Sequence, residues 1–137
     1  MRRRSVENVV LDSYALLSFL FKERGYETIV SLFEKALEEK KSLLIVSPNW
    51  AEVRYIVERK RGSHKWSEVR AKLLGLPIKI IDADEELAEE AGKIKAEHRM
   101  SLADCFAAAL AKQRKAQIYT GDPEFKCLEP ALKIVWL

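Results

Sequence analysis

The chain has 137 residues, of which 48% are hydrophobic and 33% charged, and its formal net charge at pH 7 is +3. This composition excludes an intrinsically disordered chain and predicts one globular domain over residues 1–137. Two cysteines, two histidines and no CxxC pair argue against a disulfide framework and a structural zinc site.

The first residues, Met1-Arg2-Arg3-Arg4, are basic, but no apolar signal segment follows them. No uncharged apolar run is long enough to span a membrane. We therefore expect a cytoplasmic protein with no membrane partner.

Short apolar runs alternate along the chain with longer amphipathic ones. The short runs, rich in branched or aromatic residues, predict strands at residues 8–11, 43–46, 78–81, 117–119 and 133–136. Periodic apolar positions predict helices over 26–40 and 85–98, and a charge-rich run indicates a helix that ends at Gly62. The alternation indicates an α/β protein with three α/β/α layers around a central, mostly parallel five-stranded sheet.

Four carboxylates stand at the edges of these predicted elements. Asp12 and Asp122 each follow a strand, Glu52 lies in the first turns of a helix after another strand, and Asp104 interrupts the start of an apolar helix. The carboxyl ends of the strands are where a parallel sheet binds ligands. The sequence therefore places the acids where such a fold has its active site.

Each acid, taken alone, is better explained by local structure. Asp12 can N-cap the helix that follows it, and the acid at 122 lies in a Gly-Asp-Pro turn. Asn49 as N-cap makes Glu52 the third helical residue of a capping box, and Ser101 stands in the same relation to Asp104.

The combination favours a functional interpretation. Asp12 and Asp104 adjoin strongly apolar sequence, and no Lys, Arg or His stands beside either to offset the cost of burial. Gathered carboxylates repel one another, so a cation must hold them together. Because ligands that offer only oxygen select Mg²⁺ or Mn²⁺, the cluster suits phosphate-ester chemistry.

Four segments carry a resemblance to PIN-domain ribonucleases, in the family's order, at residues 9–17, 51–59, 100–110 and 119–126. The last segment, Tyr-Thr-Gly-Asp-Pro-Glu-Phe-Lys, is the most specific, and the second is the least. The likeness covers nearly the whole chain, and its order and compact length are similar to VapC-type toxins of toxin–antitoxin pairs.

The resemblance implies a ribonuclease that hydrolyses RNA phosphodiesters with Mg²⁺ or Mn²⁺ as cofactor. Asp12, Asp104 and Asp122 would hold the ion directly or through water. Glu52 would be a further ligand, the group that orients the attacking water, or the general base. Thr120 offers a hydroxyl that would position a water. Glu124 is either an additional acid of the site or an exposed turn residue.

RNA binding needs positive charge around an acidic pocket. The basic candidates are Arg99, Arg114, Lys126 and the cluster Arg59-Lys60-Arg61. The resemblance also implies a homodimer and a cognate antitoxin protein bound in a groove. Residues 13–21 are apolar nearly all round, so this helix is either buried or shared with another chain.

Two other side chains have structural explanations. Trp66 is expected to pack in the core. His98 lies on an apolar stripe and is expected to be partly buried and hydrogen-bonded, not a ligand.

Other functions are weighed against the ribonuclease. A dehalogenase-type phosphatase needs a second acid two residues after the first, where this chain has Tyr14. A receiver domain needs its phosphoacceptor after the middle strand, but Asp82 there leads into an acidic helix start. No glycine-rich phosphate loop is present. The main alternative is a non-catalytic PIN-like scaffold that binds RNA or a protein.

Overall fold

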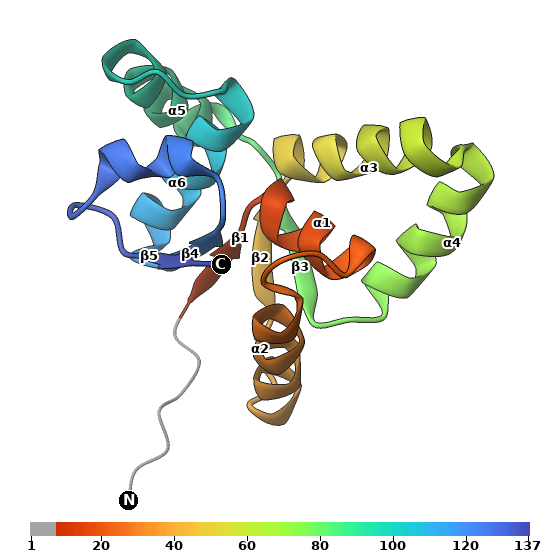
Figure 1. Cartoon of the computed structure of the whole chain (residues 1–137). Coiled ribbons are helices and arrows are strands. Elements are labelled where there is room, and N and C mark those ends of the chain that lie inside the picture. The colour runs from red at the N-terminus through yellow and green to blue at the C-terminus, as the bar shows by residue number, and fades with distance from the viewer. Residues whose placement is uncertain (1–7) are drawn as a thin grey trace, which may run out of the picture.

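A single sheet of five parallel strands forms the centre of the computed structural model, which describes residues 8–137 (Figure 1). The strands are β1 (Val9–Leu11), β2 (Leu43–Val46), β3 (Ile78–Ile81), β4 (Gln117–Thr120) and β5 (Ile134–Trp136). Their order is β3-β2-β1-β4-β5, and all neighbouring pairs are parallel. The predicted α/β class is confirmed. The basic run at residues 1–4 lies outside the described residues.

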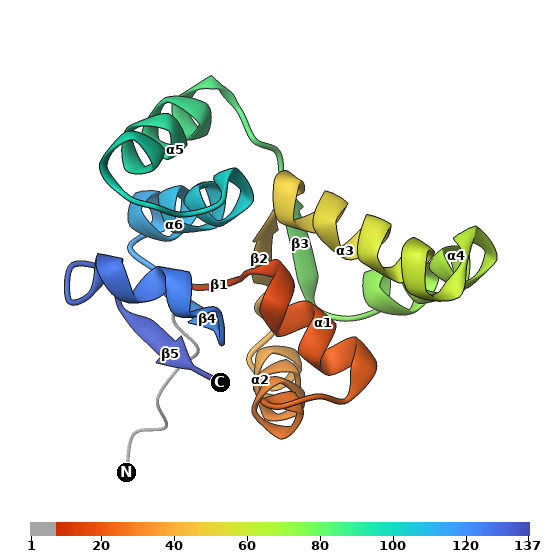
Figure 2. The same ribbon diagram turned by 45° about the horizontal axis from the view of Figure 1, so that its top comes forward.

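Helices cover both faces of the sheet (Figures 1 and 2). They are α1 (Ser13–Phe21), α2 (Tyr26–Glu38), α3 (Ser47–Arg61), α4 (Ser63–Leu74), α5 (Glu85–Glu97) and α6 (Leu102–Arg114), with a short 3₁₀ helix, η1 (Pro123–Leu128). Within residues 8–137, no helix is both long and apolar enough to cross a membrane.

Alternate strand residues supply two separate cores. Val10, Leu44 and Ile118 pack with α5 and α6, whereas Leu11 and Ile45 pack with α1 to α4. Every residue of β1 and β2 is buried, as expected of strands covered on both faces. The central strands β1 and β2 are therefore packed against helices on both faces.

Trp66 is buried in the core of α1 to α4, as predicted, with its ring 5.5 Å from that of Trp50 in an edge-on contact. The prediction that Asn49 caps α3 is wrong. The helix begins at Ser47, and Pro48 lies in its first turn, where a residue without an N–H group is well tolerated. Asn49 is instead a buried residue within the helix.

The direction in which successive strands are added to the sheet reverses at β1. From β1 the chain builds β2 and β3 on one side, then returns to add β4 and β5 on the other. Such a reversal opens a crevice at the carboxyl ends of the two strands that flank it, here β1 and β4. Asp12 follows the first of these strands and Asp122 follows the second.

Candidate active site

Asp12 is wholly buried between the end of β1 and the start of α1. Its Oδ1 accepts a hydrogen bond from the backbone N–H of Ala15 at 2.9 Å, which is the predicted N-cap. Its Oδ2 accepts the hydroxyl proton of Thr120 at 2.5 Å. Burial outweighs these bonds and raises the pKa of Asp12 to about 7, and the charges of Asp122 and Glu52 contribute to the rise.

Thr120, the last residue of β4, is also wholly buried. Besides donating to Asp12, its hydroxyl oxygen accepts a hydrogen bond from the backbone N–H of Asp122 at 3.0 Å. The hydroxyl therefore links the two aspartates that follow β1 and β4.

Asp104 lies in the first turn of α6 and is 4% exposed. Ser101 caps this helix as predicted, because its hydroxyl oxygen accepts from the Asp104 N–H at 3.2 Å. The capping box expected between Ser101 and Asp104 is completed by Glu124 instead, since the Ser101 N–H donates to Glu124 Oε2 at 3.0 Å. Burial raises the pKa of Asp104 to about 9, and a hydrogen bond with Glu124 and the charges of Asp122 and Asp12 raise it further.

Glu124, whose role the sequence left open, belongs to the acidic group. One carboxylate oxygen from each of Asp104, Asp122 and Glu124 lies within 4.8 Å of the others. Asp122 caps η1 by accepting the Glu124 N–H at 3.0 Å, which fixes the turn. The pKa of Glu124 is lowered by its hydrogen bonds with the Asp104 side chain and the Ser101 N–H, and by the charge of Lys95.

Glu52 approaches the cluster from α3, outside the close group of three. Its Oε1 accepts hydrogen bonds from the Ser13 hydroxyl at 2.7 Å and from Asn49 Nδ2 at 3.4 Å. The sequence does not predict the contact between Ser13 and Glu52. The expected capping box does pair Glu52 with Asn49, but through the Asn49 backbone N–H and not its side-chain amide. Ser13 follows Asp12 directly, and that adjacency is the signal that could have found it.

The donor set of these residues fits a hard divalent cation. All of its donors are carboxylate oxygens. Burial raises the pKa of two of these carboxyl groups, those of Asp12 and Asp104. Among the described residues, no Lys, Arg or His forms an ion pair with Asp12, Asp104 or Asp122. Buried like charges without basic partners are stabilised by a bound cation, and oxygen ligands match Mg²⁺ and Mn²⁺.

The candidate basic residues do not all lie near the site. Arg114 ends α6, and its carbonyl accepts a hydrogen bond from Asn8 Nδ2 at 3.3 Å beside the amino end of β1, opposite the end that carries the acids. Arg99, Arg114 and Lys126 are exposed. At the end of α3, Arg59 lies 4.8 Å from the ring centre of Tyr55, and Lys60 lies 4.7 Å from that of Phe21. The cluster at 59–61 thus extends beyond Glu52 along α3.

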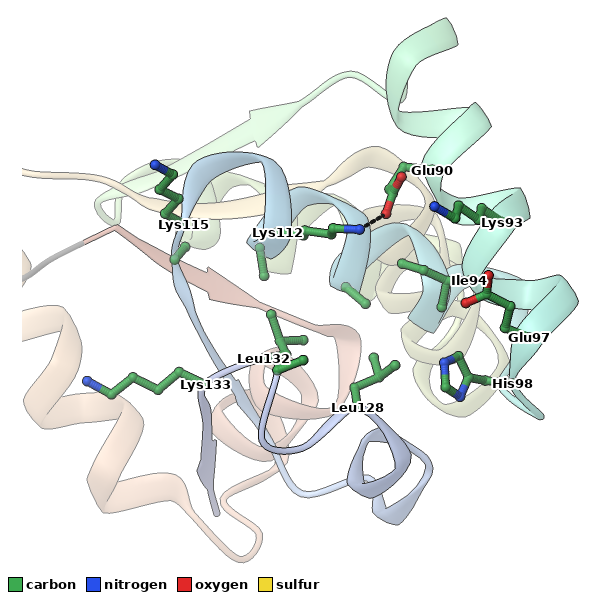
Figure 3. A pocket seen from close by; sticks show the side chains of 14 residues that line it. Glu90, Lys93, Ile94, Glu97, His98, Lys112, Lys115, Leu128, Leu132 and Lys133 are labelled. Atoms are coloured by element: carbon green, nitrogen blue, oxygen red, sulfur yellow. Dashed lines mark hydrogen bonds and ion pairs between the residues drawn. The ribbon is translucent and has the colours of Figure 1, made fainter.

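A cavity of about 550 Å³ lies away from the acids, between α5, α6 and the segment before β5 (Figure 3). Its walls carry Lys93, Lys115, Lys133 and the Lys112–Glu90 ion pair of 2.6 Å, but none of the acids of the site. His98 also lines it. His98 is half-buried as expected, but the expected side-chain hydrogen bond is not found within residues 8–137.

Comparison with known proteins agrees with this geometry. The family model described as "PIN domain" matches residues 9–129. No match is found among curated proteins. VapBC2 from Rickettsia felis, solved bound to a DNA fragment from its promoter, superposes with a TM-score of 0.74 at 18% identity, covering 94% of this chain and 98% of the other.

Two further structures are similar. A toxin–antitoxin complex from Klebsiella pneumoniae gives a TM-score of 0.72 at 17% identity, covering 93% of this chain and 96% of that one. VapC20 from Mycobacterium tuberculosis is a toxin that cleaves the sarcin–ricin loop. It gives a TM-score of 0.72 at 14% identity, covering 89% of this chain and 95% of that one. At these identities the structures establish a shared fold. Together with the family match over most of the sequence, they confirm the resemblance, and the chain belongs to the PIN domain family.

Proposed function

We propose that this protein is a Mg²⁺- or Mn²⁺-dependent endoribonuclease and the toxin of a toxin–antitoxin pair, with one catalytic domain over residues 1–137. The observation that carries the proposal is the group of carboxylates at the crevice beside β1 and β4, of which Asp12 and Asp104 are buried. A folded protein pays a free-energy penalty to bury like charges, so a cluster of this kind needs a function to explain it.

Asp104, Asp122 and Glu124 would hold the ion, with Asp12 beside them. When bound, the ion would neutralise charge on the scissile phosphate and lower the pKa of the attacking water. Asp12 and Thr120 fix the distance between the ends of β1 and β4, because their hydrogen bond leaves neither side chain free to rotate.

Glu52 is placed to orient the attacking water or to accept its proton. Its Oε1 is held by the Ser13 hydroxyl at 2.7 Å, whereas its Oε2 has no hydrogen-bond partner among the described residues. One carboxylate oxygen is therefore anchored while the other stays available to a water. This geometry supports a general base or an orienting group better than a purely structural acid.

RNA is the proposed substrate, and the antitoxin is the proposed protein partner. The solved neighbours that are toxin–antitoxin complexes support the second proposal. A hollow of about 300 Å³ between α1, α3 and α4 has apolar walls and a mostly basic rim formed by Arg61, Lys65 and Lys72. An amphipathic segment that carries acidic residues would fit this surface. A homodimer, which the family resemblance implies, and a cytoplasmic location, which is expected from the sequence, are further proposals.

The experiment is cleavage of total cellular RNA with mapping of the new 5′ ends. Wild type and Asp104→Asn are compared in Mn²⁺ and in EDTA, with Glu68→Gln, an exposed acid on α4, as the matched control. Discrete cuts that require the metal and Asp104, and that survive Glu68→Gln, are expected. Cuts that persist in EDTA would contradict a metal-dependent nuclease. Absence of both cuts and Mn²⁺ binding would leave the non-catalytic scaffold as the function.

A further inference from the structure

A hollow of about 420 Å³ is lined by residues that follow Asp12 and Glu52 along their helices. It lies between α1 and α3, which run side by side (Figure 2). The Ser13–Glu52 hydrogen bond of 2.7 Å ties the first residue of α1 to the second turn of α3. The hollow is lined further along both helices by Tyr14, Leu17, Ser18, Phe21, Glu23, Ile56 and Lys60.

Tyr14 connects the hollow directly to the loop that carries Asp122. A Cβ atom at Gly121 would lie 2.3 Å from Tyr14 Cε1, so only glycine allows the ring to lie against this loop. Ile56 follows Glu52 by four residues, which places it one helical turn further along the same face of α3. A chain that leaves the acidic cluster along these helices therefore meets the hollow first.

We propose that this hollow binds one unpaired nucleobase of a single-stranded RNA, next to the phosphate held at the acidic cluster. This inference rests on the proposed ribonuclease function and adds a base-reading subsite to it. Aromatic and aliphatic walls suit a flat base, because protein sites that read unpaired RNA stack bases on such side chains. Lys60, at the rim over Phe21, supplies the positive charge that the neighbouring phosphate needs.

Glu23 gives the subsite a chemical preference. The residue sits just after α1, where Lys22 adopts a left-handed conformation with a φ of 51° and the Glu23 N–H donates to the Ser18 carbonyl at 2.9 Å. This turn brings Glu23 to the wall of the hollow. A carboxylate accepts hydrogen bonds and donates none. It therefore favours bases with an exocyclic amino group over uracil, whose single N3–H donor is flanked by two carbonyl oxygens that repel the carboxylate.

The first test measures base burial without cleavage. RNA hexamers carrying 2-aminopurine at successive positions are titrated with the inactive Asp104→Asn protein in Mg²⁺. At one position the fluorescence should fall at least threefold on binding, because a stacked 2-aminopurine is quenched. Ile56→Trp, which fills the hollow, should abolish that quenching. Tyr55→Ala removes a tyrosine that is 42% exposed and lies outside the hollow, and it should retain the quenching.

The second test measures selectivity at the quenched position. Hexamers with adenine, cytosine or guanine there should compete at least fivefold better than the uracil hexamer. Glu23→Gln should reduce this ratio to below twofold, because an amide offers a donor as well as an acceptor. Folding of each variant is checked by circular dichroism.

Three results would overturn the proposal: quenching that is equal at all positions, quenching that survives Ile56→Trp, or a base preference that survives Glu23→Gln. If Ile56→Trp weakens binding of a protein partner but leaves RNA binding unchanged, the hollow belongs to that partner and the proposal is also wrong. Because these tests need no turnover, they give an answer even if the wild-type protein cleaves none of the RNAs.

Discussion

Thr120 donates its hydroxyl proton to Asp12, and both side chains are inaccessible to solvent. The bond joins two neighbouring strands at the point where the acids converge. It also lowers the pKa of Asp12 against the larger effect of burial. Thr120 is therefore a structural support for the aspartate beneath the proposed metal site.

Replacing Thr120 by valine keeps its shape but removes both hydrogen bonds. We expect the free energy of unfolding to fall by about 1–3 kcal/mol, because a carboxylate oxygen and the Asp122 N–H lose their partner. Urea denaturation measures the loss. Thr120→Ser retains the hydroxyl and serves as the control, so equal losses in the two variants would show that the hydroxyl is not the cause.

The stability of the metal-free protein should decrease as the pH rises. In the folded protein the pKa values of Asp12 and Asp104 are raised from 3.8 to about 7 and about 9. Above pH 4 the unfolded chain gives up these protons while the folded protein retains them, so the free energy of unfolding falls through this window.

Thermal unfolding in EDTA should therefore show a Tm at least about 3 °C lower at pH 9 than at pH 5. Asp104→Asn cannot ionise at this position, so its Tm should change less over the upper part of the range. A wild-type Tm that is constant or that rises between these pH values would contradict the raised pKa values.

Divalent cations should reverse this loss. An ion that binds only the folded protein stabilises it by about 2.7 kcal/mol at a free concentration one hundred times its Kd. The gain in Tm with Mg²⁺ or Mn²⁺ should be larger at pH 8 than at pH 5.5, because protons compete for the same carboxylates. Asp122→Asn should reduce the gain, and Glu68→Gln should not.

Glu124 can be tested for metal binding separately from its structural role. Glu124→Gln retains an acceptor for the Ser101 N–H and a partner for Asp104, so its stability should stay close to wild type. Its apparent Mn²⁺ affinity should fall by about 10- to 100-fold, the range typical when a group that supports a metal site is changed. Isothermal titration calorimetry measures this affinity.

Glu124→Ala also removes the partner of the Ser101 N–H at the start of α6. It should lose a further ~1 kcal/mol of stability, the usual cost of a lost helix cap. If the Glu124→Gln variant bound Mn²⁺ as tightly as wild type, Glu124 would be a structural residue only.

Much of the architecture is predictable from the sequence because local patterns and the final fold agree. The predicted bounds of β2 and β3 match the structure, since both are short branched runs with clear limits. Asp12 and Ser101 cap their helices as predicted, because an N-cap depends on neighbouring residues alone.

The sequence-based predictions fail where a contact joins distant segments or where two local signals compete. Asn49 is a good N-cap residue, but Pro48 and the direct exit from β2 start the helix earlier. Glu124 closes the box around Ser101 from another element, and no local spacing shows that it would replace Asp104 in that role. The Thr120 hydroxyl is oriented by the register of β1 against β4, which becomes visible only in three dimensions.

The hydrogen bond between Asp12 and Thr120 joins residues 108 positions apart. During synthesis, the first acid of the site therefore leaves the ribosome long before its strand partner exists. Pairing across such a separation is slow and comes late in folding, because the chain loses much conformational freedom before the contact forms. The nascent protein consequently lacks the groups of β4 and η1 while the segment from β1 to α6 is being made. A ribonuclease built in this way would not be assembled beside the messenger RNA that encodes it until β4 and η1 have left the ribosome.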